Sequence, residues 1–91
     1  MRFTYSITVS GKVQGVFFRQ TAKEKATALG VTGTVRNLDN GDVELIATGT
    51  KGQLDELLKW CRQGPPKAVV ENVIMQELPA MEFERFSVVR S

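Results

Sequence analysis

Hydrophobic and polar residues alternate strictly at the start of the chain, from Arg2 to Ser10. This period of two predicts a β-strand with one buried face. The apolar face comprises Phe3, Tyr5, Ile7 and Val9, and the polar face comprises Thr4, Ser6, Thr8 and Ser10. A loop with two glycines is expected over residues 11–18. A helix is expected over residues 19–29, where helix-forming residues dominate and Gly30 supplies the C-terminal glycine.

The alternation returns after Gly30 in two strands, Val31–Leu38 and Val43–Thr48. The residues between them include Asp39-Asn40-Gly41, and an Asn-Gly pair favours a tight hairpin turn because both residues tolerate positive φ. Apolar residues then recur with the 3.6-residue period of an amphipathic helix. They are Leu54, Leu57, Leu58 and Cys61. The run Gly64-Pro65-Pro66 ends this second helix.

Two further strands are predicted near the end of the chain. Ala68–Gln76 is rich in β-branched residues, and its blurred alternation allows a β-bulge. Phe86 and Val88 mark a short last strand. The order βαββαβ predicts an α+β fold of the ferredoxin-like type, an antiparallel sheet with two helices on one face. Since no linker or repeat interrupts the pattern, we expect residues 1–91 to form a single domain.

Composition narrows the classes of function. The 91 residues are 42% hydrophobic and 24% charged, which is typical of a globular protein, and the apolar runs are too short to span a membrane. Twelve basic residues are interleaved with ten acidic ones, so no nucleic-acid partner is expected. The N-terminus lacks the apolar run of a signal peptide. We therefore expect a cytoplasmic protein, and we expect a monomer.

The sequence contains no histidine and a single cysteine, Cys61. These counts exclude a disulfide within the chain, a multi-cysteine metal site and any Ser-His or Cys-His nucleophile pair. No metal or organic cofactor is expected. Because Cys61 lies on the apolar stripe of the second predicted helix, we expect it to be buried and unreactive.

Residues 11–19, Gly-Lys-Val-Gln-Gly-Val-Phe-Phe-Arg, combine three features of an anion-binding site. A glycine-containing loop can turn its backbone N–H groups inward, and a helix N-terminus adds unpaired donors and partial positive charge. Arg19 adds a guanidinium that can grip two phosphoryl oxygens, although a cation at this end opposes the helix dipole unless an anion binds there. The expected donors, which we call the anion loop, are the backbone N–H groups of Gln14, Gly15, Val16, Phe17 and Phe18. The side chains of Phe17 and Phe18 are expected to anchor the core.

The anion loop lacks the nucleophile of a cysteine phosphatase. In the pattern Cys-x5-Arg the cysteine position is occupied by Val13, and no Gly-Lys-Ser/Thr of a Walker loop follows. The remaining route of hydrolysis is direct attack by a positioned water on a substrate with a good leaving group. Asn37, near the end of the second strand, can orient such a water if the two strand ends meet. Its alternative role is that of a turn-forming asparagine.

These residues resemble the acylphosphatase family. The resemblance rests on Gly11-x-Val13-Gln14-Gly15-Val16-x-Phe18-Arg19 and on Gly33-x-Val35-x-Asn37 followed by Gly41-x-Val43-Glu44. It implies a small stand-alone enzyme that hydrolyses the carboxyl–phosphate bond of acyl phosphates without a metal or cofactor. It also implies that Arg19 binds the phosphate, that Asn37 positions the water, and that the anion loop holds the phosphoryl group. Thr34 departs from the family, which often has an aromatic residue at this position.

A non-catalytic module of the same fold, binding an anion or RNA, is the alternative. RNA recognition on such a sheet requires exposed aromatic residues on its central strands. Phe3 and Tyr5 are the candidates, but no Lys/Arg-Gly-Phe stretch accompanies them. The sequence therefore favours the enzyme.

Overall fold

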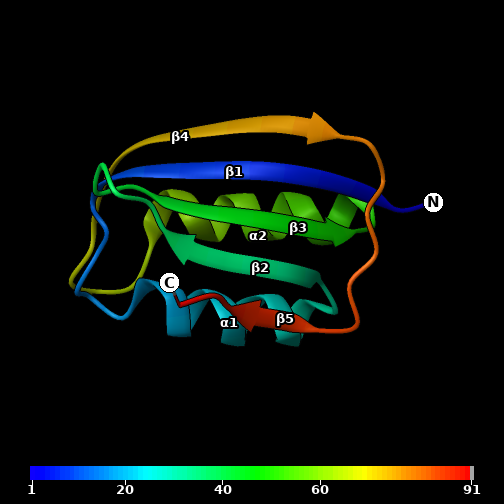
Figure 1. The fold of residues 1–91 in the computed structure, drawn as a ribbon, viewed down its shortest axis with the longest axis horizontal. Helices are drawn as coiled ribbons and strands as arrows, with labels where there is room; N and C mark the ends of the chain where they lie inside the picture. The colour runs from blue at the N-terminus through cyan, green and yellow to red at the C-terminus, as the bar shows by residue number, and fades with distance from the viewer. Residues whose placement is uncertain (91) are drawn as a thin grey trace.

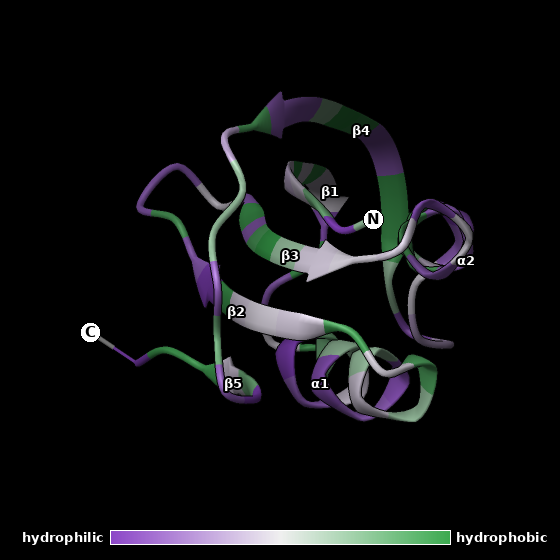
Figure 2. Ribbon diagram, turned by 90° about the vertical axis from the view of Figure 1, so that its right-hand side faces the viewer, coloured by the Kyte–Doolittle hydropathy of each residue, from purple (hydrophilic) through white to green (hydrophobic). Residues whose placement is uncertain are grey.

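The computed structural model describes residues 1–90, which form a five-stranded sheet covered on one side by two helices (Figures 1 and 2). The strands are β1 (Phe3–Lys12), β2 (Thr32–Asn37), β3 (Val43–Gly49), β4 (Val69–Leu78) and β5 (Phe86–Val88). The helices are α1 (Phe18–Leu29) and α2 (Lys51–Gln63). The strand order across the sheet is β4-β1-β3-β2-β5. The α+β, ferredoxin-like prediction is confirmed.

The prediction that the sheet is wholly antiparallel is wrong at one edge. The pairs β1–β3, β1–β4 and β2–β3 are antiparallel, but β5 runs parallel to β2, with Gly33 opposite Phe86 and Val35 opposite Val88. After β4 the chain crosses from one edge of the sheet to the other before β5 begins (Figure 1). A three-residue strand without an adjoining hairpin turn carries no signal for its partner or direction.

The core lies between the helices and the apolar face of the sheet. Tyr5, Ile7 and Val9 of β1 are all buried, as the alternation predicts. Thr4, on the opposite face, is also buried, and its hydroxyl lies 2.7 Å from that of Thr48 on β3. The buried hydroxyls are thus satisfied by one another, as buried polar groups must be.

The predicted bulge in the fourth strand is confirmed. Ser10 of β1 pairs with Asn72, whereas the next residue, Gly11, pairs with Val70, so Glu71 is the extra residue of β4. A bulge re-aims the side chains beyond it, which explains the blurred alternation of this strand.

The hairpin between β2 and β3 differs in detail from the expected Asn-Gly turn. The Leu38 carbonyl accepts from the Gly41 N–H at 3.2 Å, and the Leu38 N–H donates to the Asp42 carbonyl at 2.8 Å. Gly41 has φ of 98°, but Asn40 does not adopt positive φ. The turn therefore needs only its glycine in the left-handed region, as in a three-residue hairpin loop closed by glycine.

Membrane-spanning helices are not found within residues 1–90, where neither helix is both long and apolar enough to cross a bilayer.

Candidate active site

The C-terminal ends of β1 and β2 lie at the same end of the sheet, one on each side of β3. Val43, at the start of β3, pairs with Val9 of β1 on one side and with Asn37 of β2 on the other. Since both strands run antiparallel to β3, they run in the same direction. The loop that follows β1 therefore emerges beside the end of β2 (Figure 1).

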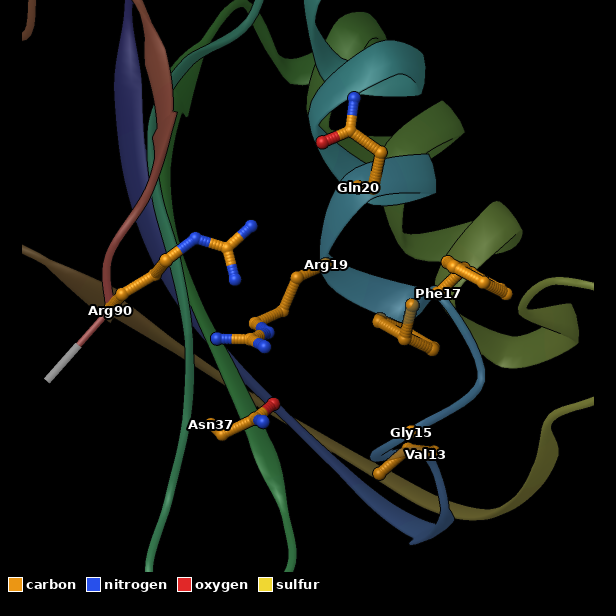
Figure 3. A pocket seen from close by; sticks show the side chains of 8 residues that line it. Val13, Gly15, Phe17, Arg19, Gln20, Asn37 and Arg90 are labelled. Atoms are coloured by element: carbon orange, nitrogen blue, oxygen red, sulfur yellow. The ribbon is translucent and has the colours of Figure 1, made fainter.

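A cavity of about 290 Å³ opens at this end of the sheet. It is lined by Val13, Gly15, Phe17, Phe18, Arg19, Gln20, Asn37 and Arg90. The structure thus brings together Arg19, Asn37 and part of the anion loop, although Arg19 and Asn37 are 18 residues apart in the sequence. In Figure 3 the side chain of Arg19 reaches across the cavity toward Asn37.

The anion loop is held by buried side chains within it and just before it. Val13, Val16 and Phe18 are buried, whereas Phe17 is 77% exposed. Phe18 anchors the core as expected and packs against the Trp60 ring, with the ring centroids 5.1 Å apart. The expectation that Phe17 also anchors the core is wrong, because its left-handed backbone turns its side chain away from the core that receives its neighbours.

The backbone of this segment leaves its donors available. Phe17 is the N-cap of α1 with φ of 63° and ψ of 24°, and no side chain caps the helix. Gly15 also lies in the left-handed region, with φ of 73°. Within residues 1–90, no hydrogen bond engages the backbone N–H groups of residues 14–18. Alternation of right- and left-handed backbone conformations at a helix start forms the concavity in which proteins bind anions.

Gln14 has a structural role that the sequence analysis missed. Its side-chain amide donates to the carbonyl of Leu38 at 2.8 Å and to that of Asp42 at 2.9 Å. Both carbonyls belong to the β2–β3 hairpin, next to Asn37. The Gln14 side chain thereby fixes the anion loop against the strand end that carries Asn37. A glutamine inside a glycine-containing loop is the only sequence signal for this link.

Asn37 presents an unused acceptor to the site. Its Oδ1 atom is buried, and no donor among the described residues bonds to it. An orphaned buried carbonyl costs stability unless a ligand or water satisfies it. Arg19 similarly forms no ion pair with any carboxylate of residues 1–90. The amide and the guanidinium are therefore free to bind groups that enter the cavity.

Arg90 is a further site residue that the sequence analysis missed. It follows β5, which runs parallel to β2, so continuing the register of Val35 with Val88 places Arg90 opposite Asn37. A second cavity of about 330 Å³ is lined by Arg19, Asn37, Val89 and Arg90. The antiparallel sheet expected from the sequence gave no reason to place Arg90 there.

No side chain that commonly acts as a nucleophile lines the first cavity within the described part of the chain. Cys61 is buried on α2, as expected, and burial raises the pKa of its thiol from 9.0 to about 12, while the charge of nearby Arg62 acts in the opposite direction. Among residues 1–90, no three His, Cys, Asp or Glu side chains are grouped so that they could hold a metal ion.

Thr34 and the aromatic residues of β1 lie away from the cavity. Thr34 lines neither cavity, and it pairs with Ile46 and Ser87 within the sheet. Tyr5 is buried, and Phe3 packs against the core. Tyr5 therefore has no exposed ring and Phe3 only a partly exposed one, which weakens the RNA-binding alternative because stacking on a base needs an exposed ring.

Comparisons with known proteins show the family to which the chain belongs. The model of the acylphosphatase family matches residues 5–88. An acylphosphatase from Rubrobacter xylanophilus is 54% identical over 81% of this chain and 67% of its own length. One from Marinobacter nauticus is 52% identical over 90% of each chain. The solved structure of an acylphosphatase from Coxiella burnetii superimposes with a TM-score of 0.94, at 44% identity, covering 97% of this chain and 93% of that one.

Proposed function

Because the chain belongs to the acylphosphatase family, and is thus a hydrolase of acyl phosphates, we propose specific roles for the residues of its cavity. Residues 1–91 act as one acylphosphatase-like domain. The anion loop and Arg19 bind the phosphoryl group, and Asn37 positions the attacking water. The observation that carries the proposal is the buried, unpartnered Oδ1 of Asn37, which shares one cavity with Arg19 and Gly15.

Phosphate binding is supported by the donors that the loop leaves unused. The N–H groups of residues 14–18 make no hydrogen bond within the described chain, and Gly15, Phe17 and Phe18 line the same cavity as the Arg19 guanidinium, so partial and full positive charge lies beside one small volume. These donors are held in place by the buried side chains of Val13, Val16 and Phe18 and by the Gln14 amide. Donors fixed before the substrate arrives stabilise the charge that spreads over the phosphoryl oxygens in the transition state.

Water positioning is supported by the acceptor of Asn37. A water that donates one hydrogen to Oδ1 has its oxygen lone pairs available for the phosphorus atom. The water oxygen forms the new P–O bond as the bond between phosphorus and the acyl oxygen breaks. The acyl group leaves as a carboxylate, and the surplus proton of the water passes to solvent. The amide orients the nucleophile and does not accept its proton.

A covalent phospho-enzyme is disfavoured by the same lining, which offers no common nucleophile among the described residues. No general acid is needed either, because a carboxylate is already a good leaving group. The absence of histidine from the sequence therefore agrees with the proposed chemistry.

Hydrolysis of benzoyl phosphate in EDTA, followed by absorbance, tests these roles. We expect kcat/KM to fall by roughly 10²–10³ in both Arg19→Ala and Asn37→Ala, the size of effect typical of a transition-state donor. The two variants should differ in phosphate inhibition. Arg19→Ala raises the Ki of inorganic phosphate, whereas Asn37→Ala leaves it near the wild-type value because its partner is the water.

Arg62→Ala and Asn72→Ala are matched controls, because both residues are exposed and line neither cavity of the site. Near-normal turnover in Arg19→Ala would contradict the phosphate-binding role. Hydrolysis in ¹⁸O-labelled water adds a second check, since attack on phosphorus puts the label in phosphate. Label in the carboxylate would overturn the proposed direction of attack. Metal independence, cytoplasmic location and a monomeric state remain predictions from the sequence.

A further inference from the structure

We propose that Arg90 makes this enzyme selective for acyl phosphates whose acyl group carries a second anionic group, such as a carboxylate. The inference rests on the proposed function, because it takes the phosphoryl group to lie on the anion loop and Arg19. It assigns Arg90 a different part of the substrate.

The parallel pairing of β5 brings Arg90 to the site. The Val89 N–H donates to the Val35 carbonyl at 2.9 Å, which fixes the chain to β2 one residue before Arg90. Figure 3 shows the Arg90 side chain entering from the strand side, with its guanidinium directed toward that of Arg19. The two arginines thus reach the same space from separate elements.

The second cavity is where the acyl group of the substrate would bind. It shares Arg19, Asn37 and Arg90 with the first cavity, but its lining includes Val89 and none of residues 13–18. The space therefore continues from the anion loop past Arg19 toward Arg90. With the phosphoryl group on the loop, an acyl group extends into this second cavity. There Val89, 39% exposed, offers apolar contact.

The charges of the two cavities favour an additional anion. Neither is lined by an aspartate or glutamate of the described chain, so two guanidinium groups share the space without a carboxylate. Arg19 and the loop suffice for the phosphoryl group. A planar guanidinium beyond them matches a carboxylate with two parallel hydrogen bonds.

Two substrates that differ in one group test this selectivity: benzoyl phosphate and 4-carboxybenzoyl phosphate. The para position keeps the carboxylate from attacking its own anhydride. In Arg90→Gln, we expect kcat/KM for the carboxylated substrate to fall about tenfold, chiefly through KM, as expected for loss of a charge-assisted pair. The same quantity for benzoyl phosphate should fall at most about threefold, through weaker attraction of anions in general. The Ki of inorganic phosphate should likewise change by at most about threefold.

Arg85→Gln is the matched control, since it removes the same charge beside the other end of β5 and lines neither cavity. Arg85→Gln should leave unchanged the ratio of kcat/KM for 4-carboxybenzoyl phosphate to that for benzoyl phosphate. Arg90→Lys should retain part of the preference for the carboxylated substrate. Equal losses for both substrates in Arg90→Gln, with a raised phosphate Ki, would place Arg90 at the phosphoryl group and overturn the inference. An unchanged ratio of the two kcat/KM values in Arg90→Gln would also overturn the inference.

Failure of the proposed function has a separate signature. Normal benzoyl phosphate turnover in Arg19→Ala would refute the phosphate-binding role of Arg19, whatever Arg90→Gln does to the substrate ratio. A changed ratio in Arg90→Gln with intact Arg19 dependence supports both assignments.

Discussion

The two helices pack on the same face of the sheet but begin in opposite ways (Figure 2). At the start of α2, Thr50 Oγ1 accepts from the Gln53 N–H at 3.3 Å, and Gln53 Oε1 accepts from the Thr50 N–H at 2.9 Å. This reciprocal capping box satisfies two donors that a helix leaves open. At the start of α1, Phe17 occupies a left-handed conformation and supplies no cap.

The basic residues of the two first turns differ in the same sense. Lys51 opens α2 and lies 3.8 Å from Asp55, one turn along the helix. Arg19 has no such partner among residues 1–90. One helix start is closed by its own side chains, whereas the other keeps donors and charge unmatched. Local rules that are broken at the start of α1 and obeyed at the start of α2 are the pattern expected of a functional site, and they agree with the site proposed at α1.

The largest effect that the comparison predicts concerns Cys61, the buried thiol on α2. Burial raises the pKa of its thiol from the ordinary value of 9.0 to about 12. At pH 8, the native thiol should react with a disulfide reagent about 10³-fold more slowly than the unfolded thiol, because each pKa unit is a tenfold change in thiolate. Rapid native labelling, measured beside guanidinium-unfolded protein, would show that this helix opens readily.

The same shift fixes a pH dependence of stability. The unfolded thiol loses its proton above pH 9 while the native thiol keeps it, so the unfolded state binds fewer protons there. The stabilising contribution is complete below pH 9 and is lost as pH rises toward 12. Chemical denaturation between pH 8 and pH 10 should therefore show a steeper loss for wild type than for Cys61→Ala.

Binding of phosphate at the open helix start gives the next effect. At phosphate 100 times its Kd, the free energy of unfolding should rise by about 2.7 kcal/mol, because the ligand binds only the folded state. Thr50→Ala should show the same increase, since the α2 cap is no part of the site. Arg19→Ala should show a much smaller one. Denaturation with and without phosphate at matched ionic strength measures this, and an undiminished increase in Arg19→Ala would place the anion elsewhere.

The sequence predicted most of the fold because the signals were local. The alternation in β1, the glycine after α1 and the heptad-like spacing in α2 are all read within a few residues. The parallel direction of β5 was not predictable in this way, since it depends on a chain crossing between sheet edges. Arg90 was missed for the same reason: its place beside Asn37 follows from that parallel register.

The candidate site was predictable where a motif carried it and not where packing decided. Arg19 and the anion loop were predicted from residue types and spacing and Asn37 from the family motif, and the structure brings Arg19, Asn37 and part of the loop to one cavity. The exposure of Phe17 was not, because two adjacent phenylalanines look alike in sequence while backbone conformation sends them to opposite environments. The two hydrogen bonds of the Gln14 side chain likewise depend on the hairpin standing opposite the loop.

Removing the cap of α2 should affect stability alone. Thr50→Ala should lower the free energy of unfolding by about 1 kcal/mol, the usual cost of losing an N-cap hydroxyl. Thr50→Ser should retain most of that energy because it keeps the hydroxyl. Both variants should hydrolyse benzoyl phosphate at the wild-type kcat/KM. A loss of activity in Thr50→Ala would mean that the two helix starts are coupled and do not have separate roles.

The smallest effects should have opposite signs at the two helix starts. A Cβ added at Gly15 or at Gly52 meets no atom within 4 Å, so neither substitution causes a clash. Gly15 has φ of 73°, which alanine adopts at a cost of about 1 kcal/mol, whereas Gly52 lies within α2, where alanine gains up to about 1 kcal/mol. Gly15→Ala should therefore destabilise the protein and lower kcat/KM by moving the N–H donors. Gly52→Ala should stabilise it and leave kcat/KM unchanged. Paired denaturation curves measure both, and a stabilising Gly15→Ala with full activity would show that the left-handed turn is not what holds the donors in place.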